Sequence, residues 1–314
     1  MDSELAERSP VTGVPRRLIR GVAAAQSSRG KSGDTGQAYL LLAPTIFWLG
    51  LFLLVPLVLV TITSLTTRGA YGETVYRWTL ANYTRFFEPI YLQILWRSLS
   101  VAFWTTVLTL ALGYPFAYFL AQVPARRRGT LLMLVVVPFW TNFLIRTYAW
   151  VVILRTTGVI NTLLQGLGLV TDPLALLYTP GAVLLGMVYG FLPFMVLPLY
   201  TSLEKLDHAL LEAASDLGAP PWRTFLRVTL PLTMPGVVAG TILVFIPALG
   251  MFVVPDLLGG ARTMLIGNLI QNQFLTARNW QFGSAASIIL MALVTVGLLV
   301  YARAFGFEGE ELAG

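Results

Sequence analysis

Residues 203–236 read LEKLDHALLEAASDLGAPPWRTFLRVTLPLTMPG and form an island of mixed charge between two long apolar segments. Apolar residues recur through the first half of this island at steps of three and four, which predicts a short amphipathic helix. They are Leu206, Leu210, Leu211, Ala214 and Leu217. Gly218 then stands where a left-handed C-terminal cap is favoured. Because Pro220-Pro221 suits the first turn of a helix, we expect two short helices joined by a sharp turn.

The chain around this island is too apolar for a water-soluble globule. Of its 314 residues, 56% are hydrophobic and 11% are charged, and the mean hydropathy is +0.73; an ordinary soluble domain has about 25% charged residues. A membrane-spanning helix needs roughly 20 apolar residues. The sequence therefore predicts an all-α integral membrane protein with six transmembrane helices. We expect these at 39–65, 94–123, 131–154, 180–203, 234–254 and 283–305.

The basic residues indicate how the spans are oriented. Most of the 21 Lys and Arg residues fall on the inner side if the N-terminus is cytoplasmic. The short loop with Arg126, Arg127 and Arg128 is the best single determinant, because moving three charges to the outer side is costly. Both termini are therefore expected in the cytoplasm. Since the basic residues lie at the edges of apolar runs, we expect contact with membrane lipid and no nucleic-acid partner.

The same pattern predicts the domain organisation. We expect a flexible cytoplasmic tail at 1–37, a transmembrane domain at 38–305 with the charged loop at 204–233, and a short acidic cytoplasmic tail at 306–314. A semi-apolar stretch at 264–277, in the last outer loop, favours a helix that packs on the outer face or enters the membrane partway.

Several classes of function lack the residues that they need. The chain has no Cys and a single His, so we expect no metal site and no bound cofactor. Gly30-Lys31-Ser32 is like the end of a phosphate loop, but Ala25 stands where the first Gly is required, which indicates no ATP site. An ion-coupled carrier needs carboxylates inside its spans, and a membrane enzyme needs clustered His, Asp or Glu. We find neither, which favours a subunit driven by another protein over these two alternatives.

The charged loop also contains a motif with specific spacing. It consists of Glu212-Ala213-Ala214, three residues, Gly218, nine residues, Val228, one residue and Leu230-Pro231. This motif resembles the EAA loop of binding-protein-dependent ABC importer permeases, with Val228 where that family usually has Ile. The resemblance implies a type I importer permease fold, in which the first helix of the loop is a coupling helix held in a cleft of an ATPase subunit.

The resemblance assigns the ATPase-coupling role to the motif residues, to which we add two charged neighbours from the same loop. The coupling-loop residues are Glu212, Ala213, Ala214, Asp216, Gly218 and Arg223. From the residues alone there is a second interpretation. A short amphipathic helix pair also suits the membrane surface, with Arg223 and Arg227 on lipid phosphates.

Five further stretches resemble the spermidine/putrescine-type subfamily of these permeases. They lie at 112–121, 138–150, 168–180, 191–207 and 255–274. This resemblance implies a polyamine as the solute, a bacterial inner-membrane location, and three partners: a cytoplasmic ABC ATPase dimer that uses the ATP, a second homologous permease and an extracytoplasmic solute-binding protein. The chain departs from the subfamily at Met251, where an acidic residue is usual. Another small charged solute, such as an amino-acid-derived compound, is the alternative.

A few polar residues in or near the spans are candidates for the translocation path: Asn142, Arg146, Tyr148 and Asp256. An arginine inside a span has to face protein, water or a partner. Arg146 therefore either lines the path or the interface between two permeases, or it extends outward and fixes a loop. Asp256 either meets a cationic solute at the outer mouth or caps residues 257–260. Tyr148 offers a cation–π surface or anchors the chain at the interface.

Overall fold

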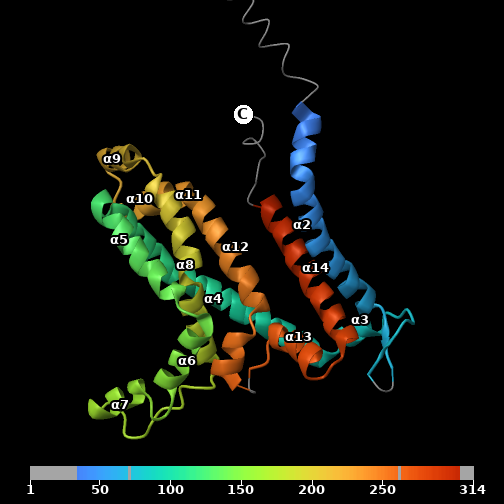
Figure 1. Ribbon diagram of the computed structural model, residues 1–314. Helices are drawn as coiled ribbons and strands as arrows, with labels where there is room; N and C mark the ends of the chain where they lie inside the picture. Colours follow the sequence, from blue (N-terminus) through green and yellow to red (C-terminus); the bar gives the residue numbers. More distant parts are fainter. Residues whose placement is uncertain (1–33, 70–71, 261–262, 305–314) are drawn as a thin grey trace, which may run out of the picture. The chain divides into compact units, whose positions relative to one another are not determined.

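The computed structural model describes residues 34–69, 72–260 and 263–304. The chain divides into two compact units at residues 59 and 60. The first unit contains most of helix α2 (Asp34–Ser64), and every later element lies in the second (Figure 1). The expected N-terminal tail lies outside the described residues, except for residues 34–37. These are helical and extend α2 beyond the predicted start of the first span at residue 39.

The second unit is helical apart from one short hairpin, in which Thr67 of β1 pairs with Val75 of β2. Its elements are β1 (Thr67–Arg68), β2 (Thr74–Val75), α3 (Ala81–Phe86), α4 (Pro89–Gln122), α5 (Ala125–Val136), η1 (Val137–Trp140), α6 (Phe143–Leu154), α7 (Val159–Gly166), α8 (Pro180–Glu204), α9 (His208–Asp216), α10 (Pro221–Thr224), η2 (Phe225–Thr229), α11 (Leu230–Leu232), α12 (Met234–Gly250), η3 (Pro255–Gly259), α13 (Ile266–Leu275) and α14 (Trp280–Ala304). η1 is a 3₁₀ turn, whereas η2 and η3 are π-helical turns.

Among the described residues, five helices are long and apolar enough to cross a membrane, or up to six if one bent pair counts as a single span. The bent pair joins residues 221–232 to α12 at an angle of 65°. The predicted span at 180–203 matches α8 to within one residue. The structure therefore confirms the all-α, multi-span class.

The boundaries of three other spans differ from prediction for local reasons. α4 begins at Pro89 rather than at residue 94, because proline is favoured in the first turn. α12 ends at Gly250 rather than at residue 254, because Met251 is extended. α14 begins before residue 283, where the Asn279 side chain accepts a hydrogen bond from the Phe282 N–H. The last predicted residue of that span, Phe305, lies outside the described residues.

The prediction of one continuous helix at 131–154 is wrong. Pro138 has no N–H to donate and cannot continue the ladder of α5, so the chain passes through the 3₁₀ turn η1. Thr141 is then extended, and Asn142 starts α6 by accepting the Leu144 N–H at 2.8 Å. The candidate span in this region is Phe143–Gly166, which includes α7.

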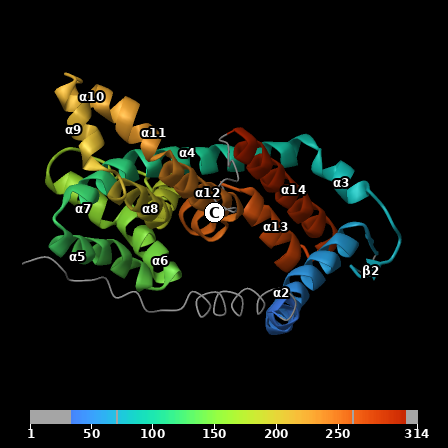
Figure 2. The same cartoon turned by 90° about the horizontal axis from the view of Figure 1, so that it is seen from above.

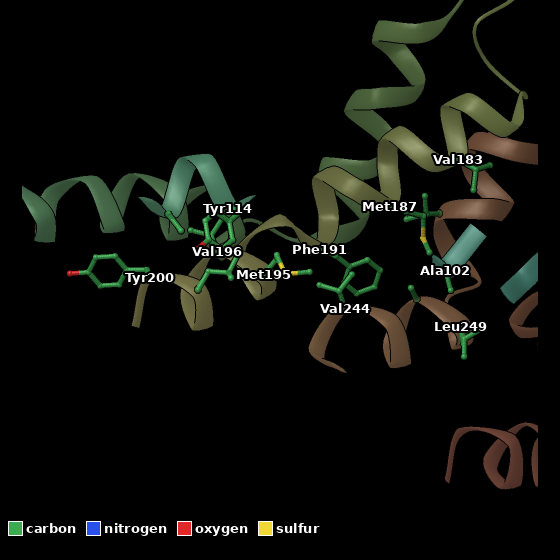
Figure 3. Close-up of a cluster of buried hydrophobic side chains, with 14 of the residues drawn as sticks. Ala102, Tyr114, Val183, Met187, Phe191, Met195, Val196, Tyr200, Val244 and Leu249 are labelled. Carbon is green, nitrogen blue, oxygen red and sulfur yellow. The ribbon is translucent and has the colours of Figure 1, made fainter. Parts of the chain in front are cut away.

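The main core lies where α4, α8 and α12 pack side by side (Figures 1 and 2). Figure 3 shows Met195 and Val196 of α8 next to Tyr114 of α4, with Val244 of α12 nearby. Alanine and glycine allow this close approach, as is typical of helix packing in membranes. A Cβ added at Gly236 of α12 would lie 2.7 Å from the Pro198 carbonyl oxygen of α8.

A second cluster joins α13 and α14 to the start of α4. Its buried members are Phe86, Ile266, Leu269, Phe282 and Ala286. The Ser98 side chain of α4 accepts the Ile266 N–H at 2.7 Å, which satisfies a donor at the start of α13. The predicted helix in the last outer loop is therefore confirmed, and it packs against α14.

The contact between α8 and α12 leads to a stability prediction. Gly236→Ala should lower the melting temperature of the detergent-purified protein, because overpacking a core costs about 1–3 kcal/mol. Gly297→Ala is the matched control: a Cβ there meets no atom within 4 Å, and alanine favours helix over glycine by about 0.5–1 kcal/mol. Equal melting temperatures for the two variants would contradict the close packing.

Candidate functional site

The first helix of the charged loop, α9, has strong caps at both ends. Asp207 accepts the Ala209 N–H at 2.9 Å at its start. At its end, the Gly218 N–H donates to the Ser215 carbonyl at 2.9 Å and the Ala219 N–H donates to the Ala214 carbonyl at 3.1 Å. Gly218 has a φ of +76°. Both bonds and this φ define a Schellman motif, so the predicted left-handed cap is confirmed.

α9 exposes most of the residues that sequence reasoning assigned to coupling. Glu212, Ala213, Asp216 and Gly218 are exposed, and Ala214 is half-buried. The apolar side predicted for this amphipathic helix is only partly buried. Leu206 and Leu211 are half-buried, but Leu217 is 88% exposed. The turn at Gly218 places Leu217 at the tip of the loop, where it packs against nothing in the described part of the chain.

The second half of the loop is anchored to α4. The Phe225 ring packs edge-on against Tyr114, with the ring centroids 5.5 Å apart. The Tyr114 hydroxyl is 2.8 Å from the Thr233 hydroxyl, at the bend before α12. This segment therefore contacts both α4 and the bend that leads into α12. On its outer side Arg223 is exposed and lies over the Trp222 ring at 5.2 Å.

Arg128 has a structural role that the sequence did not reveal. Its guanidinium donates to the carbonyls of Val123 at 2.6 Å and Ala121 at 2.8 Å, which lie at the C-terminal end of α4. It also pairs with Glu204, the last residue of α8, at 3.2 Å. Arg128 thus ties α4 and α5 to the point where the charged loop begins. The only signal was a cluster of three arginines, which indicated orientation alone.

A cavity of about 290 Å³ lies between this arginine and α9. Its wall includes Tyr118 and Gln122 of α4, Arg128, and Leu206 and Leu211. The charged loop is therefore held to the helix bundle through its ends, and α9 does not fill the space beneath it.

The four candidate path residues do not form one cluster. Asn142 is the N-cap of α6, and the Tyr148 side chain is exposed. Arg146 is half-buried and lines a cavity of about 310 Å³ together with Met251. Asp256 lines a different cavity of about 780 Å³ with Arg155 and Tyr178.

The position of Asp256 differs from the predicted cap. Its carboxylate accepts a 2.6 Å hydrogen bond from the Asn268 side chain instead of capping residues 257–260. Asn268 also donates to the Phe252 carbonyl at 2.8 Å and is 4% exposed. It therefore braces the η3 turn against α13.

These features define a multi-span membrane protein of the transporter class, with a capped, exposed helix in the loop that follows α8. The chain belongs to the family of binding-protein-dependent transport system inner membrane components, whose model matches residues 113–306. It is accordingly a multi-pass protein of the inner membrane.

Two relatives illustrate the match. The chain is 50% identical over 257 residues to the spermidine/putrescine transport system permease protein PotB of Escherichia coli K12, covering 82% of this chain and 94% of that one. It is 34% identical over 242 residues to the inner membrane ABC transporter permease protein YdcU of the same organism, covering 73% and 77%.

The fold is similar to that of solved importers. A chain of a bacterial alginate ABC transporter, crystallised with an alginate pentasaccharide-bound periplasmic protein, superposes with a TM-score of 0.69 at 19% sequence identity. The match covers 86% of this chain and 94% of that one. A second structure of an alginate importer gives a TM-score of 0.63 and covers 92% and 98%. The type I permease fold is confirmed.

The contacts of Arg128 lead to a second prediction. Arg128→Ala should destabilise the purified protein by at least about 1.5 kcal/mol, because hydrogen bonds to charged groups contribute about 1.5–3 kcal/mol each. Glu204→Gln should cost less than about 1 kcal/mol, since that pair is partly exposed. Arg126→Ala, at an exposed neighbour, is the control. Thermal unfolding in detergent measures all three, and an Arg128→Ala variant as stable as the control would show that the carbonyl contacts do not contribute.

Proposed function

We propose that this chain is the permease subunit of an ATP-driven importer of polyamines such as spermidine and putrescine. The observation that carries the proposal is the 50% identity to PotB, which extends over 94% of that protein. The chain resembles YdcU, a permease of another system, less closely, at 34% identity. Met251 lacks the carboxylate of the wider subfamily, so cation recognition would depend on other groups in the path.

The proposal includes three partners. A soluble binding protein delivers the solute from outside, and a second, homologous permease completes the path. A cytoplasmic ABC ATPase dimer supplies the energy, so this chain binds no ATP and no other cofactor. The alginate importer, crystallised with its periplasmic protein, supports the general arrangement.

The charged loop is the point at which the ATPase would act. α9 presents small and charged residues around Ala213, and the exposed Leu217 is available to enter an apolar pocket. Closure of the ATPase dimer would pull on α9. The Phe225–Tyr114 contact and the Tyr114–Thr233 hydrogen bond would then pass this motion to α4 and α12. The path would switch between inward-facing and outward-facing states by a shift in their populations.

Transport by the reconstituted complex tests the proposed function. The chain is assembled in liposomes with its ATPase, the second permease and the binding protein, and radiolabelled putrescine and spermidine are added outside. We expect uptake that requires ATP and the binding protein. Uptake of another charged solute but not of polyamines would contradict the substrate. Uptake without the ATPase would instead favour a stand-alone carrier.

The positive φ of Gly218 leads to a prediction about coupling. A left-handed conformation costs an ordinary L-residue about 1–2 kcal/mol, whereas Asn adopts it more easily. No atom lies within 4 Å of a Cβ added there. The cost of a substitution at this position within the chain therefore comes from the backbone conformation and not from a steric clash. Gly218→Asn should retain most uptake, and Gly218→Val should lose uptake and the stimulation of ATPase activity.

Gly166→Val is the matched control, because a Cβ at this position also meets no atom within 4 Å and its φ is not positive. Unchanged transport and ATPase activity in Gly218→Val would show that the turn has no role in coupling.

Leu217 distinguishes docking on the ATPase from lying on lipid. Burying a leucine in a partner stabilises a complex by about 1.5–3 kcal/mol. Leu217→Ser should therefore weaken ATPase binding by roughly ten- to a hundredfold, as measured by titration of the permease in nanodiscs. Leu167→Ser, at a leucine that is 72% exposed at the C-cap of α7, should not change the affinity. If both variants bind the ATPase as the parent does, α9 rests on lipid instead.

A further inference from the structure

The half-buried Arg146 guanidinium lies against three aromatic rings. Its central carbon is 4.2 Å from the centroid of the Phe139 ring and 5.6 Å from those of Phe143 and Tyr189. The rings also support one another, since Phe139 stacks on Tyr189 at 5.9 Å and Trp150 meets Tyr189 edge-on at 5.5 Å. We call Phe139, Phe143 and Tyr189 the aromatic cage. Its three rings come from η1, α6 and α8.

The cation in this cage has no counter-ion in the described part of the chain: no carboxylate there lies within salt-bridge distance of Arg146. Its one polar contact is to the Pro138 carbonyl at 3.4 Å, which is long for a hydrogen bond. The faces of the rings are therefore its main source of stabilisation, through their negative quadrupoles. A site with this chemistry attracts any cation of similar size, because neither the rings nor the carbonyl is specific for guanidinium.

A cavity of about 310 Å³ adjoins the cage. Gly186 and Gly190 line it, and Met187 and Phe191, both labelled in Figure 3, form part of its wall. Met251 also lines the cavity, and no acidic residue of the described part of the chain does. An apolar volume large enough for a small amine thus lies beside a cation that the protein itself supplies.

We propose that the aromatic cage is a subsite for one ammonium group of the transported solute, and that Arg146 is a tethered cation which fills this subsite while the path is empty. Two cations cannot share the cage, because like charges a few ångströms apart repel strongly in a low dielectric. The solute has to displace Arg146, and a solute with several ammonium groups does so best because its other charges are bound elsewhere. The cage would thereby recognise a cation even though position 251 is a methionine and supplies no carboxylate. This inference rests on the proposed function, from which it takes the solute.

Replacing the tethered cation tests the competition directly. Arg146→Met keeps an unbranched apolar stem but removes the guanidinium and its charge, so the KM for putrescine uptake should fall by about tenfold, as expected for the loss of one competing cation contact. Arg146→Lys keeps a cation and should leave the KM near that of the parent. Tyr189→Leu removes one face of the cage and should raise the KM. A purely structural role of Arg146 would instead lower yield and kcat in both Arg146 variants, with the KM unchanged, and would overturn the proposal.

A soluble cation provides a second test that needs no polyamine. On this proposal Arg146 also holds the empty path closed in the resting complex, so the resting ATPase activity of the reconstituted complex should rise in Arg146→Ala. Millimolar guanidinium should restore the low activity in Arg146→Ala and have no effect on the parent or on Arg146→Ala combined with Tyr189→Leu. Resting activity that is insensitive to guanidinium in Arg146→Ala would refute the tethered-cation role.

If the parent complex transports no polyamine, the proposed function fails, and this ATPase comparison still decides whether Arg146 closes the path.

Discussion

Close approach of α4, α8 and α12 is the constraint on which the rest of the structure depends. Helices in a bilayer gain no hydrophobic stabilisation from packing on one another, so backbone proximity and van der Waals contact have to hold them together. Gly236 and Gly240 approach the backbone of α8 closely, since an added Cβ would lie 2.7 Å from the Pro198 carbonyl oxygen and 3.3 Å from that of Met195. Because the three helices fit only at this distance, the two ends of α8 are fixed. The charged loop begins at one of these ends, and the segment that contains α6 and α7 precedes the other.

The polar side-chain contacts described above lie where the helices of this chain are interrupted. In hydrocarbon a free backbone donor or acceptor is tolerated only where protein or water satisfies it. The break at Pro138 leaves its carbonyl near Arg146 and starts α6 with an Asn142 cap. The break at Thr233 is tied to Tyr114, and the η3 turn is braced by Asn268. Each interruption therefore has a specific polar partner, and each lies beside the coupling loop or beside a cavity that contains a candidate path residue.

Local signals made much of this predictable. The length of α8, the Schellman cap at Gly218 and the start of α10 at Pro221 follow from residues within one turn of the feature. The break in the third predicted span was missed because the apolar run continues across Pro138, and hydropathy does not register a single missing N–H. Arg128, Asn268 and Arg146 could not be assigned for a different reason. Their partners include Glu204, Phe252 and Tyr189, which lie on other elements, and no periodicity connects residues so far apart in the chain.

Two arginines, one beside the coupling loop and one beside a candidate path cavity, are stabilised in different ways. In the described part of the chain most charged side chains lie near helix ends or in loops. Arg128 uses its charge to secure the start of the charged loop. Arg146 is different, because it has aromatic faces in place of an anion. A carboxylate in that cavity would hold a polycation strongly and slow its release, whereas π faces bind a cation weakly enough for transfer. A protein that moves cations through an apolar path has to bind each cation and then release it. Aromatic rings bind the cation, and the protein's own arginine replaces it when it leaves.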